Sequence, residues 1–113
     1  MMLPYRIGIL KSSLPNDRMI LKDILPGQNT LYKNISLHFL RIPPLSKCER
    51  ELERLREQVY IILKGEGKIV FKEYNKSMNI ERGDIVYIPP AYTHTIINTG
   101  DYEMDILIIY SPP

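Results

Sequence analysis

The chain has 113 residues, the size of one domain with one modest hydrophobic core. Apolar residues make up 44% and charged residues 25%, both near globular averages, which excludes disordered and fibrous classes. The net charge of +2, from 15 basic and 13 acidic residues, gives no electrostatic reason to expect a nucleic-acid partner.

Membrane insertion and secretion also find no support in the sequence. The longest apolar runs, Val59–Leu63 and Ile106–Tyr110, are far too short for a spanning helix. Arg6 interrupts the apolar N-terminal stretch, so no secretion signal is predicted. Cys48 is the only cysteine, which rules out an internal disulfide. We therefore expect a cytoplasmic protein.

Short apolar runs separated by turn residues follow one another along the chain. The runs are rich in Ile, Val, Tyr and Leu, and the breaks carry Pro, Gly, Asn and Asp. Regular spacing without intervening helices is typical of a β-barrel or sandwich. In chain order, the predicted strands are Tyr5–Leu10, Met19–Leu25, Ile35–Ile42, Gln58–Lys64, Lys68–Glu73, Ile85–Ile88, His94–Asn98 and Met104–Tyr110.

One segment, Cys48–Gln58, disagrees with this pattern. It reads CERELERLREQ and consists of strong helix formers, and Leu52, Leu55 and Val59 recur at helical spacing. Local propensity slightly favours a helix over a charged extended strand, and tertiary contacts can override that preference.

The most informative pattern is Gly83–Asn98, GDIVYIPPAYTHTIIN. A glycine turn leads into a strand, two prolines end it, and a histidine opens the next strand. This arrangement resembles the second motif of the cupin family, G-x5-P-x-G-x2-H-x3-N, with Ala91 in place of the middle glycine. The matching positions are Gly83, Pro89, His94 and Asn98.

The resemblance covers roughly Ile35–Pro113 and implies an all-β fold, the antiparallel double-stranded β-helix or cupin jelly-roll barrel. We expect one domain over 1–113, with N-terminal strands in 1–34 and the core barrel in 35–113. Small barrels hold one small ligand in their interior. Cupins often pair through outer strands, so we expect a homodimer, with neither nucleic acid nor membrane as a partner.

The first cupin motif, H-x-H-x3-or-4-E-x6-G, supplies the metal ligands of the family. The stretch QVYIILKGEGKI resembles its end, and counting back from Gly65 places Gln58 where the glutamate stands. With four intervening residues, the two histidine places fall on Glu51 and Glu53. With three, they fall on 52 and 54, a leucine and an arginine, and no metal site remains.

Two interpretations of the cofactor stay open. Because both histidines are missing, we expect no cofactor. In the first register, Glu51, Glu53, Gln58 and His94 would instead form an oxygen-rich site suited to Mn, Fe(II) or Mg. The segment carries charges on nearly every position, which favours a solvated surface for the two glutamates.

The candidate ligand-binding residues are Gln58, Tyr60, His94, Tyr87 and Tyr92. Tyr60 shares strand parity with Gln58, so both should face the barrel interior with His94. His94 and Tyr60 are the candidate catalytic pair. The alternative for each is ordinary packing with a satisfied polar group.

Small-molecule binding by a degenerate or non-metal cupin is the favoured function. One alternative is a metal-dependent cupin enzyme of the dioxygenase or sugar-phosphate isomerase type, with the unusual Glu/Gln/His site. Another is a metal-free epimerase or isomerase that uses His94 as base and a tyrosine as acid.

Overall fold

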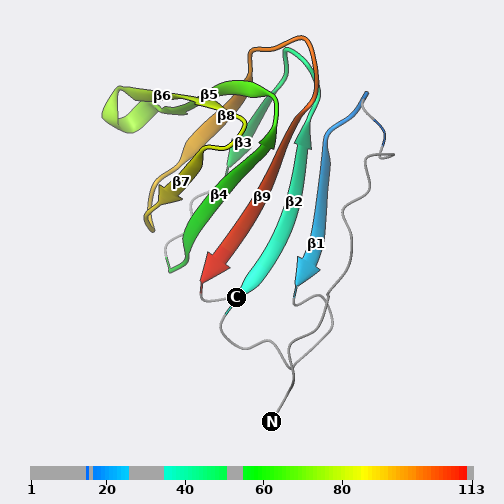
Figure 1. Ribbon diagram of the computed structural model, residues 1–113. Helices are drawn as coiled ribbons and strands as arrows, with labels where there is room; N and C mark the ends of the chain where they lie inside the picture. Colours follow the sequence, from blue (N-terminus) through cyan, green and yellow to red (C-terminus); the bar gives the residue numbers. More distant parts are fainter. Residues whose placement is uncertain (1–14, 16, 26–34, 51–54, 112–113) are drawn as a thin grey trace.

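The computed structural model describes residues 15, 17–25, 35–50 and 55–111 (Figure 1). Over these residues the chain forms strands and one 3-10 turn, without an α-helix. The elements are β1 (Ile20–Leu25), β2 (Ser36–Ile42), β3 (Lys47–Arg50), β4 (Glu57–Lys64), β5 (Glu66–Phe71), η1 (Lys72–Tyr74), β6 (Lys76–Glu81), β7 (Ile85–Ile88), β8 (His94–Asn98) and β9 (Met104–Ser111). No helix in these ranges has the length and apolar character needed to cross a bilayer.

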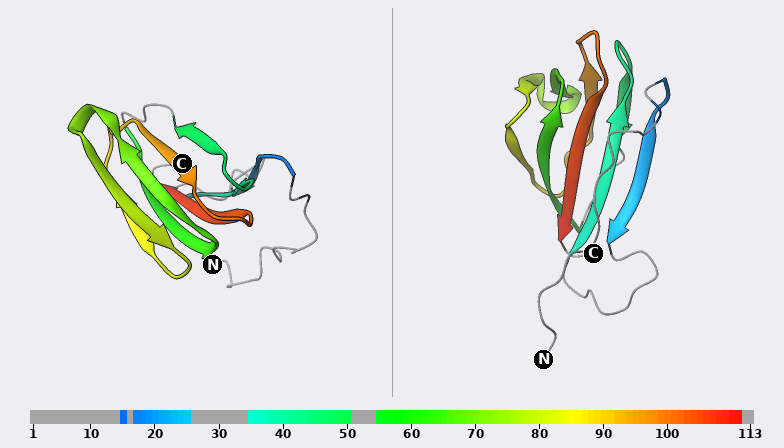
Figure 2. Two further views of the ribbon diagram at one scale, coloured as in Figure 1. Left: turned by 90° about the horizontal axis from the view of Figure 1, so that it is seen from above. Right: turned by 45° about the vertical axis from the view of Figure 1, so that its right-hand side comes forward.

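Two antiparallel sheets face each other across the interior (Figures 1 and 2). The five-stranded sheet has the order β1-β2-β9-β4-β7, and the four-stranded sheet has the order β3-β8-β5-β6. The predicted all-β, antiparallel fold class is therefore confirmed.

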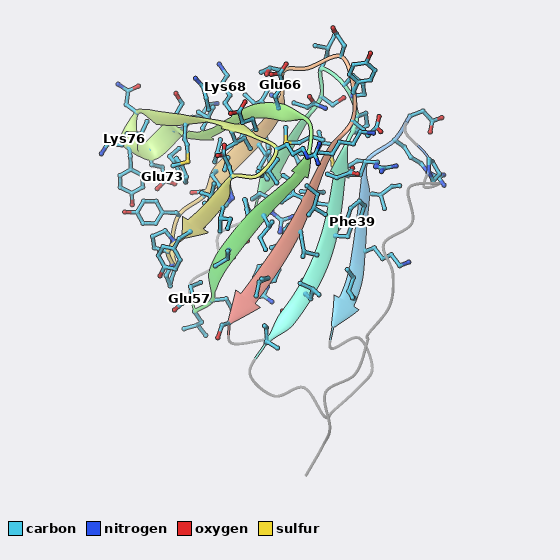
Figure 3. The ribbon with its side chains drawn as sticks, viewed as in Figure 1. Phe39, Glu57, Glu66, Lys68, Glu73 and Lys76 are labelled. Carbon is cyan, nitrogen blue, oxygen red and sulfur yellow. The ribbon has the colours of Figure 1, made fainter. Side chains whose placement is uncertain are left out.

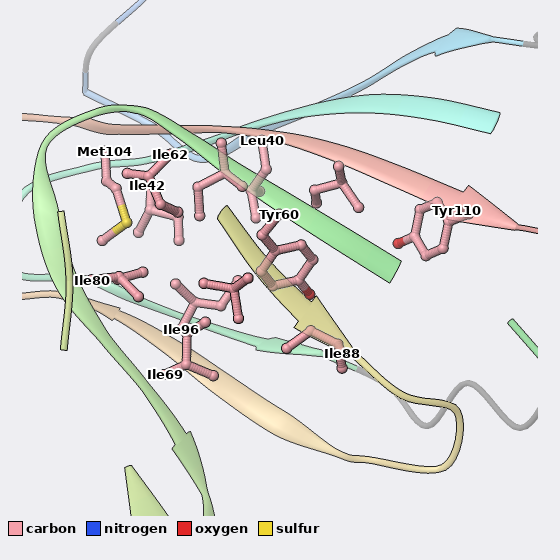
Figure 4. Close-up of a cluster of buried hydrophobic side chains, with 13 residues drawn as sticks. Leu40, Ile42, Tyr60, Ile62, Ile69, Ile80, Ile88, Ile96, Met104 and Tyr110 are labelled. Carbon is pink, nitrogen blue, oxygen red and sulfur yellow. The ribbon is translucent and has the colours of Figure 1, made fainter. Parts of the chain in front are cut away.

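The hydrophobic core lies between the inner faces of the sheets because side chains alternate along each strand (Figure 4). On β4, for example, Tyr60 and Ile62 are buried while Leu63 is exposed.

The strand register places Ser36, Gln58 and Tyr110 in one row across β2, β9 and β4. This row makes one end of the interior polar. The core comprises Leu40, Ile42, Tyr60, Ile62, Ile69, Ile80, Val86, Ile88, Ile96, Met104, Ile106, Ile108 and Tyr110.

Most predicted strands recur within a residue or two, and β7 and β8 match residue for residue. The predicted strands leave out Lys76–Glu81, where strand β6 lies. The chain turns through η1, Asn75 takes a left-handed conformation (φ 49°), and pairing with β5 starts at Lys76. The predicted strand Tyr5–Leu10 lies outside the described residues.

The helix slightly favoured over Cys48–Gln58 is wrong for the residues that the structure describes there. Lys47–Arg50 is strand β3, and β4 begins at Glu57. Strand β3 pairs residue by residue with β8, from Lys47 opposite Ile97 to Arg50 opposite His94. These ladder hydrogen bonds override the helical propensity of the sequence.

Two residues of the Gly83–Asn98 motif have clear structural roles. Gly83 has φ +94°, a conformation that glycine adopts without a Cβ penalty. The Asn98 amide nitrogen donates to the carbonyls of Ile42 and Tyr102 at 2.9 and 2.8 Å, and its oxygen accepts from the Gly100 N–H at 2.9 Å. Asn98 therefore ties the β2–β3 turn to the β8–β9 loop.

Candidate functional site

Three side chains meet at the polar end of the interior. Tyr60 and Gln58 come from β4, and His94 comes from β8 in the opposite sheet. The Tyr60 hydroxyl oxygen lies 2.6 Å from His94 Nε2 and 3.2 Å from Gln58 Oε1. All three residues are buried, with at most 4% of their surface exposed. The structure thus brings together the three residues that strand parity placed in the interior.

The hydrogen bonds fix the protonation of His94. Its Nδ1 lies 2.9 Å from the Tyr92 carbonyl oxygen, which can only accept, so Nδ1 carries the hydrogen. Burial is the largest effect on the pKa of His94 and lowers it, and the positive charge of Arg50 lowers it further. The hydrogen bond to the Tyr92 carbonyl raises the pKa but does not outweigh these two effects. The ring is therefore neutral at neutral pH, and Nε2 accepts a hydrogen bond from the Tyr60 hydroxyl.

Tyr60 stays protonated in this setting. Burial raises the pKa of its hydroxyl well above the usual value, and the positive charge of Arg50 opposes this only in part. One phenolic proton therefore has two acceptors within reach, His94 and Gln58. The pair therefore holds the proton at Tyr60 Oη, and His94 Nε2 accepts the hydrogen bond.

Arg50 is a site residue that sequence reasoning missed. It pairs with His94 across β3 and β8, and its guanidinium donates to the Tyr110 hydroxyl. Burial acts to lower the pKa of Arg50, but Tyr60 and Tyr110 outweigh this and keep it raised. No carboxylate of the described residues forms an ion pair with it. Reading Cys48–Arg50 as a strand would have placed Arg50 inward, on the same face as Cys48.

A second guanidinium lies beside the same tyrosine. The Arg56 guanidinium carbon is 4.1 Å from the centre of the Tyr110 ring, a cation–π contact. The His38 ring meets that ring edge-on at 4.8 Å. The polar end of the barrel therefore combines two arginines, two phenols and two imidazoles.

The remaining predicted site residues lie elsewhere. Tyr87 alternates with buried Val86 and Ile88, so it faces outward and is 55% exposed. Tyr92 precedes β8 and is half-buried, and its carbonyl rather than its ring contacts His94. Positions 51 and 53, the two candidate metal-binding glutamates Glu51 and Glu53, lie outside the described residues.

The described residues do not fit the divalent metal that cupins often hold. They contain no group of three or more His, Cys, Asp or Glu side chains placed to bind an ion. Both nitrogens of His94 are engaged, one by Tyr60 and one by Tyr92. The Arg50 charge beside the imidazole would also repel a cation.

A pocket of about 470 Å³ borders this cluster at His94 and Arg50. The pocket opens where β5 diverges from β8 beyond the last pair, Val70 and Thr95. Its lining also includes Glu49, Thr95 and Val70, which form one outward-facing row across β3, β8 and β5, and His94 itself is 4% exposed. The full lining is Glu49, Arg50, Val70, Lys72, Glu73, Thr93, His94 and Thr95.

Comparisons with known proteins agree with this architecture. A family model described as Cupin domain matches residues 38–110. This chain belongs to the cupin family. The RmlC-like cupin protein from Desulfovibrio desulfuricans superimposes with a TM-score of 0.78 at 16% identity, covering 97% of this chain and 99% of that one. The predicted family and barrel fold are therefore confirmed.

Curated relatives of this cupin differ in their functions. An uncharacterized protein of Methanocaldococcus jannaschii is 30% identical over 106 residues, 92% of this chain and 82% of the relative. The glucose-6-phosphate isomerase of Pyrococcus horikoshii is 38% identical over 61 residues, 51% of this chain and 32% of the enzyme. The oxalate-binding protein of Thermotoga maritima is 30% identical over 70 residues, which cover 62% of this chain and 56% of that protein. The match thus spans only about a third of the isomerase.

Proposed function

We propose that this cupin binds a small anionic molecule at the polar end of its barrel without a metal. The observation that carries the proposal is the Arg50 guanidinium. It is half-buried beside His94 and Tyr60, it hydrogen bonds to a phenol, and it has no carboxylate partner among the described residues. A partly desolvated charge without a counterion is costly, and an anionic ligand would compensate it.

Arginine also sets the chemistry of the ligand. Its planar fork of N–H donors matches a carboxylate or a phosphate in two-point contact. The Tyr110 hydroxyl, which accepts from the guanidinium, would supply a further hydrogen bond to a bound oxygen. Two relatives carry names that refer to such anions, oxalate and glucose 6-phosphate. Their shared chemistry supports a carboxylate or phosphate ligand here.

Isothermal titration calorimetry with oxalate and with inorganic phosphate tests the proposal. We expect at least one anion to bind the wild type, and Arg50→Met to weaken binding at least tenfold, because a charge-assisted hydrogen bond is worth about 1.5–3 kcal/mol. Arg82→Met is the matched control, since Arg82 is exposed in the turn before Gly83. Arg50→Lys keeps the charge without the fork and should fall between wild type and Arg50→Met.

Two results would contradict the anion site. One is the absence of binding by the wild type for both anions. The other is equal binding by Arg50→Met and Arg82→Met. Circular dichroism establishes whether each variant folds. If Arg50→Met does not fold, Arg50→Lys replaces it in the comparison with Arg82→Met.

The 2.6 Å contact between Tyr60 Oη and His94 Nε2 favours a second candidate, a metal-free epimerase or isomerase. A substrate would first displace the Tyr60 hydroxyl from His94 Nε2. Neutral His94 would then take a proton from the carbon beside the substrate carbonyl, and Tyr60 would donate one. Glucose 6-phosphate in deuterium oxide with excess EDTA should then exchange its C2 proton, seen by NMR. Tyr60→Phe should abolish exchange, and Tyr87→Phe should retain it. Wild-type protein without exchange would remove this candidate.

The metal-dependent alternative depends on Glu51 and Glu53, which are not among the described residues. Gln58 and His94 are the members of that ligand set which the structure describes, and both contact Tyr60. The described part of the chain therefore gives this alternative no support.

The outer face of the five-stranded sheet supports the expected homodimer. Cross-strand rows place Tyr87, Val59 and Ile109 side by side, with Ile85, Ile61 and Leu107 in the next row. Ile85 is 71% exposed and stands on the edge strand β7. We propose that a second copy covers this apolar face. Light scattering should show a dimer for the wild type and a monomer for Ile85→Asp; a wild-type monomer at micromolar concentration would contradict this.

A further inference from the structure

A second pocket, of about 260 Å³, opens on the side of the barrel, between the edge strands of the two sheets. Strand β6 is the edge of the four-stranded sheet, and Pro89 follows β7, the edge of the five-stranded sheet. The pocket is lined by Phe71, Tyr74, Lys76, Ser77, Met78, Pro89 and Tyr92. Pro89 and Tyr92 belong to the second cupin motif, but neither Arg50 nor His94 of the proposed anion site lines this pocket.

Three aromatic rings form much of the wall. The Tyr74 and Tyr92 rings stack with centroids 4.7 Å apart and planes 26° apart. The Phe71 ring meets Tyr92 edge-on, with centroids 6.0 Å apart. Aromatic rings attract one another in stacked and edge-on arrangements, so these contacts hold the three lining rings against one another.

The aromatic wall is held in place before any ligand arrives. The Thr93 hydroxyl donates to Glu73 Oε1 at 2.7 Å, which ties the neighbours of Tyr92 and Tyr74 together. Ala91, immediately before Tyr92, has φ 69°, a strained conformation for an alanine. Strain of this kind persists where the surroundings impose it, often at binding sites. A preorganised wall loses less entropy when a ligand binds.

Lys76 sets the charge preference of the pocket. It is the one charged residue of the lining, and it pairs with Phe71 across β5 and β6, so both face the same side of the sheet. Figure 3 shows Lys76 and Glu73 at the same end of this hairpin. Glu73 is bonded to Thr93, and Lys76 makes no ion pair with a described residue. The pocket therefore favours an anion over a cation.

We infer that this pocket binds a single aromatic ring that carries a carboxylate. The ring would lie against Tyr74, Tyr92 and Phe71, and the carboxylate would pair with Lys76. The pocket volume of about 260 Å³ fits one ring. It lies between the cavity of about 150 Å³ that accepts benzene and the pockets of about 300–1,000 Å³ that bind drug-sized ligands.

The aromatic pocket and the anion site are separate binding sites that share one wall. The centroid of the Phe71 ring lies 6.0 Å from that of the Tyr92 ring in the pocket. It lies 5.6 Å from the centroid of the His94 ring at the polar end of the interior. Arg50 does not line the aromatic pocket, and Lys76 does not line the opening beside Arg50. Variants of these two cations therefore test the two sites independently.

Methyl NMR of methionine-labelled protein, titrated with benzoate, tests the inference. Met78 lines the pocket, and Met104 in the core is an internal control. We expect benzoate to shift the Met78 methyl signal and to leave Met104 in place. Neutral benzamide should bind more weakly, and cationic benzylamine more weakly still. Lys76→Gln should remove the preference for benzoate over benzamide.

A pair of tyrosine variants isolates the stacking contribution. Tyr74→Ala should weaken benzoate binding about fivefold, because an aromatic pair contributes on the order of a factor of two to ten. Tyr87→Ala, an exposed tyrosine on the outer face, and Arg50→Met should leave it unchanged. An unmoved Met78 signal, equal losses in Tyr74→Ala and Tyr87→Ala, or benzylamine binding as tightly as benzoate would each overturn the inference.

Discussion

Replacing Tyr60 with phenylalanine tests the buried hydrogen bonds at the centre of the site. The ring is 0% exposed and its packing would be kept, so the change removes only the hydroxyl. His94 Nε2 and Gln58 Oε1 then lose their donor at 2.6 and 3.2 Å, and both residues are buried. His94 cannot compensate by changing tautomer, because Nδ1 donates to Tyr92. A buried polar group left without a partner costs about 1–3 kcal/mol, and the shorter bond carries most of the loss.

We therefore expect Tyr60→Phe to lower the free energy of unfolding by about 1–3 kcal/mol, measured by urea denaturation. Tyr87→Phe, at a tyrosine 55% exposed on the outer face, should change it by less than about 0.5 kcal/mol. The NMR titration of the His94 ring should also move to higher pKa, because the neutral imidazole loses a donor. An unchanged stability together with an unchanged His94 pKa would refute the hydrogen-bond geometry.

Three further predictions concern the backbone and pH. Gly67→Ala should lower stability by about 3 kcal/mol or prevent folding in thermal denaturation, since its Cβ would lie 2.1 Å from the Ile97 carbonyl oxygen. Gly100→Ala should cost far less, because its nearest contact would be the flexible Glu66 side chain at 3.2 Å. Ala91→Gly should raise the free energy of unfolding by up to about 1 kcal/mol, because the left-handed conformation costs alanine about 1–2 kcal/mol and glycine's extra chain entropy offsets part of that gain; a loss of stability would contradict it. Folding lowers the pKa of His94, so the unfolded state takes up the proton first, and stability should fall as the pH drops below the reference value of 6.5. Urea unfolding should show that the free energy of unfolding falls less between about pH 7.5 and about pH 5.5 for His94→Gln than for wild type. Equal falls in the two proteins would count against a buried neutral His94.

The sequence predicted the β7–β8 region best, because its signals are local. Gly83 permits the positive-φ turn that leads into β7. Pro89 then ends β7, which runs from Ile85 to Ile88. The next strand starts at His94, and its alternation turns the imidazole inward. Each step depends on neighbouring residues, so the second cupin motif could be located without knowledge of the rest of the barrel.

Arg50 and strand β6 were missed because long-range pairing decides them. The β3 segment has helical propensity, and only its ladder with β8 makes it extended and turns Arg50 toward His94. Strand β6 has a polar sequence in which Ile80 is the one buried residue, so its alternation is weak. The aromatic pocket likewise depends on η1 and the loop before β8, 18 residues apart at Tyr74 and Tyr92, packing together.

The affinity for oxalate, measured by calorimetry first with excess EDTA and then with excess Mn²⁺, tests the central claim most directly. Because Arg50 rather than a metal is proposed to hold the anion, oxalate should bind in EDTA, and Mn²⁺ should not tighten it. Binding that appears only after Mn²⁺ is added would contradict the account and point to Glu51 and Glu53 as metal ligands.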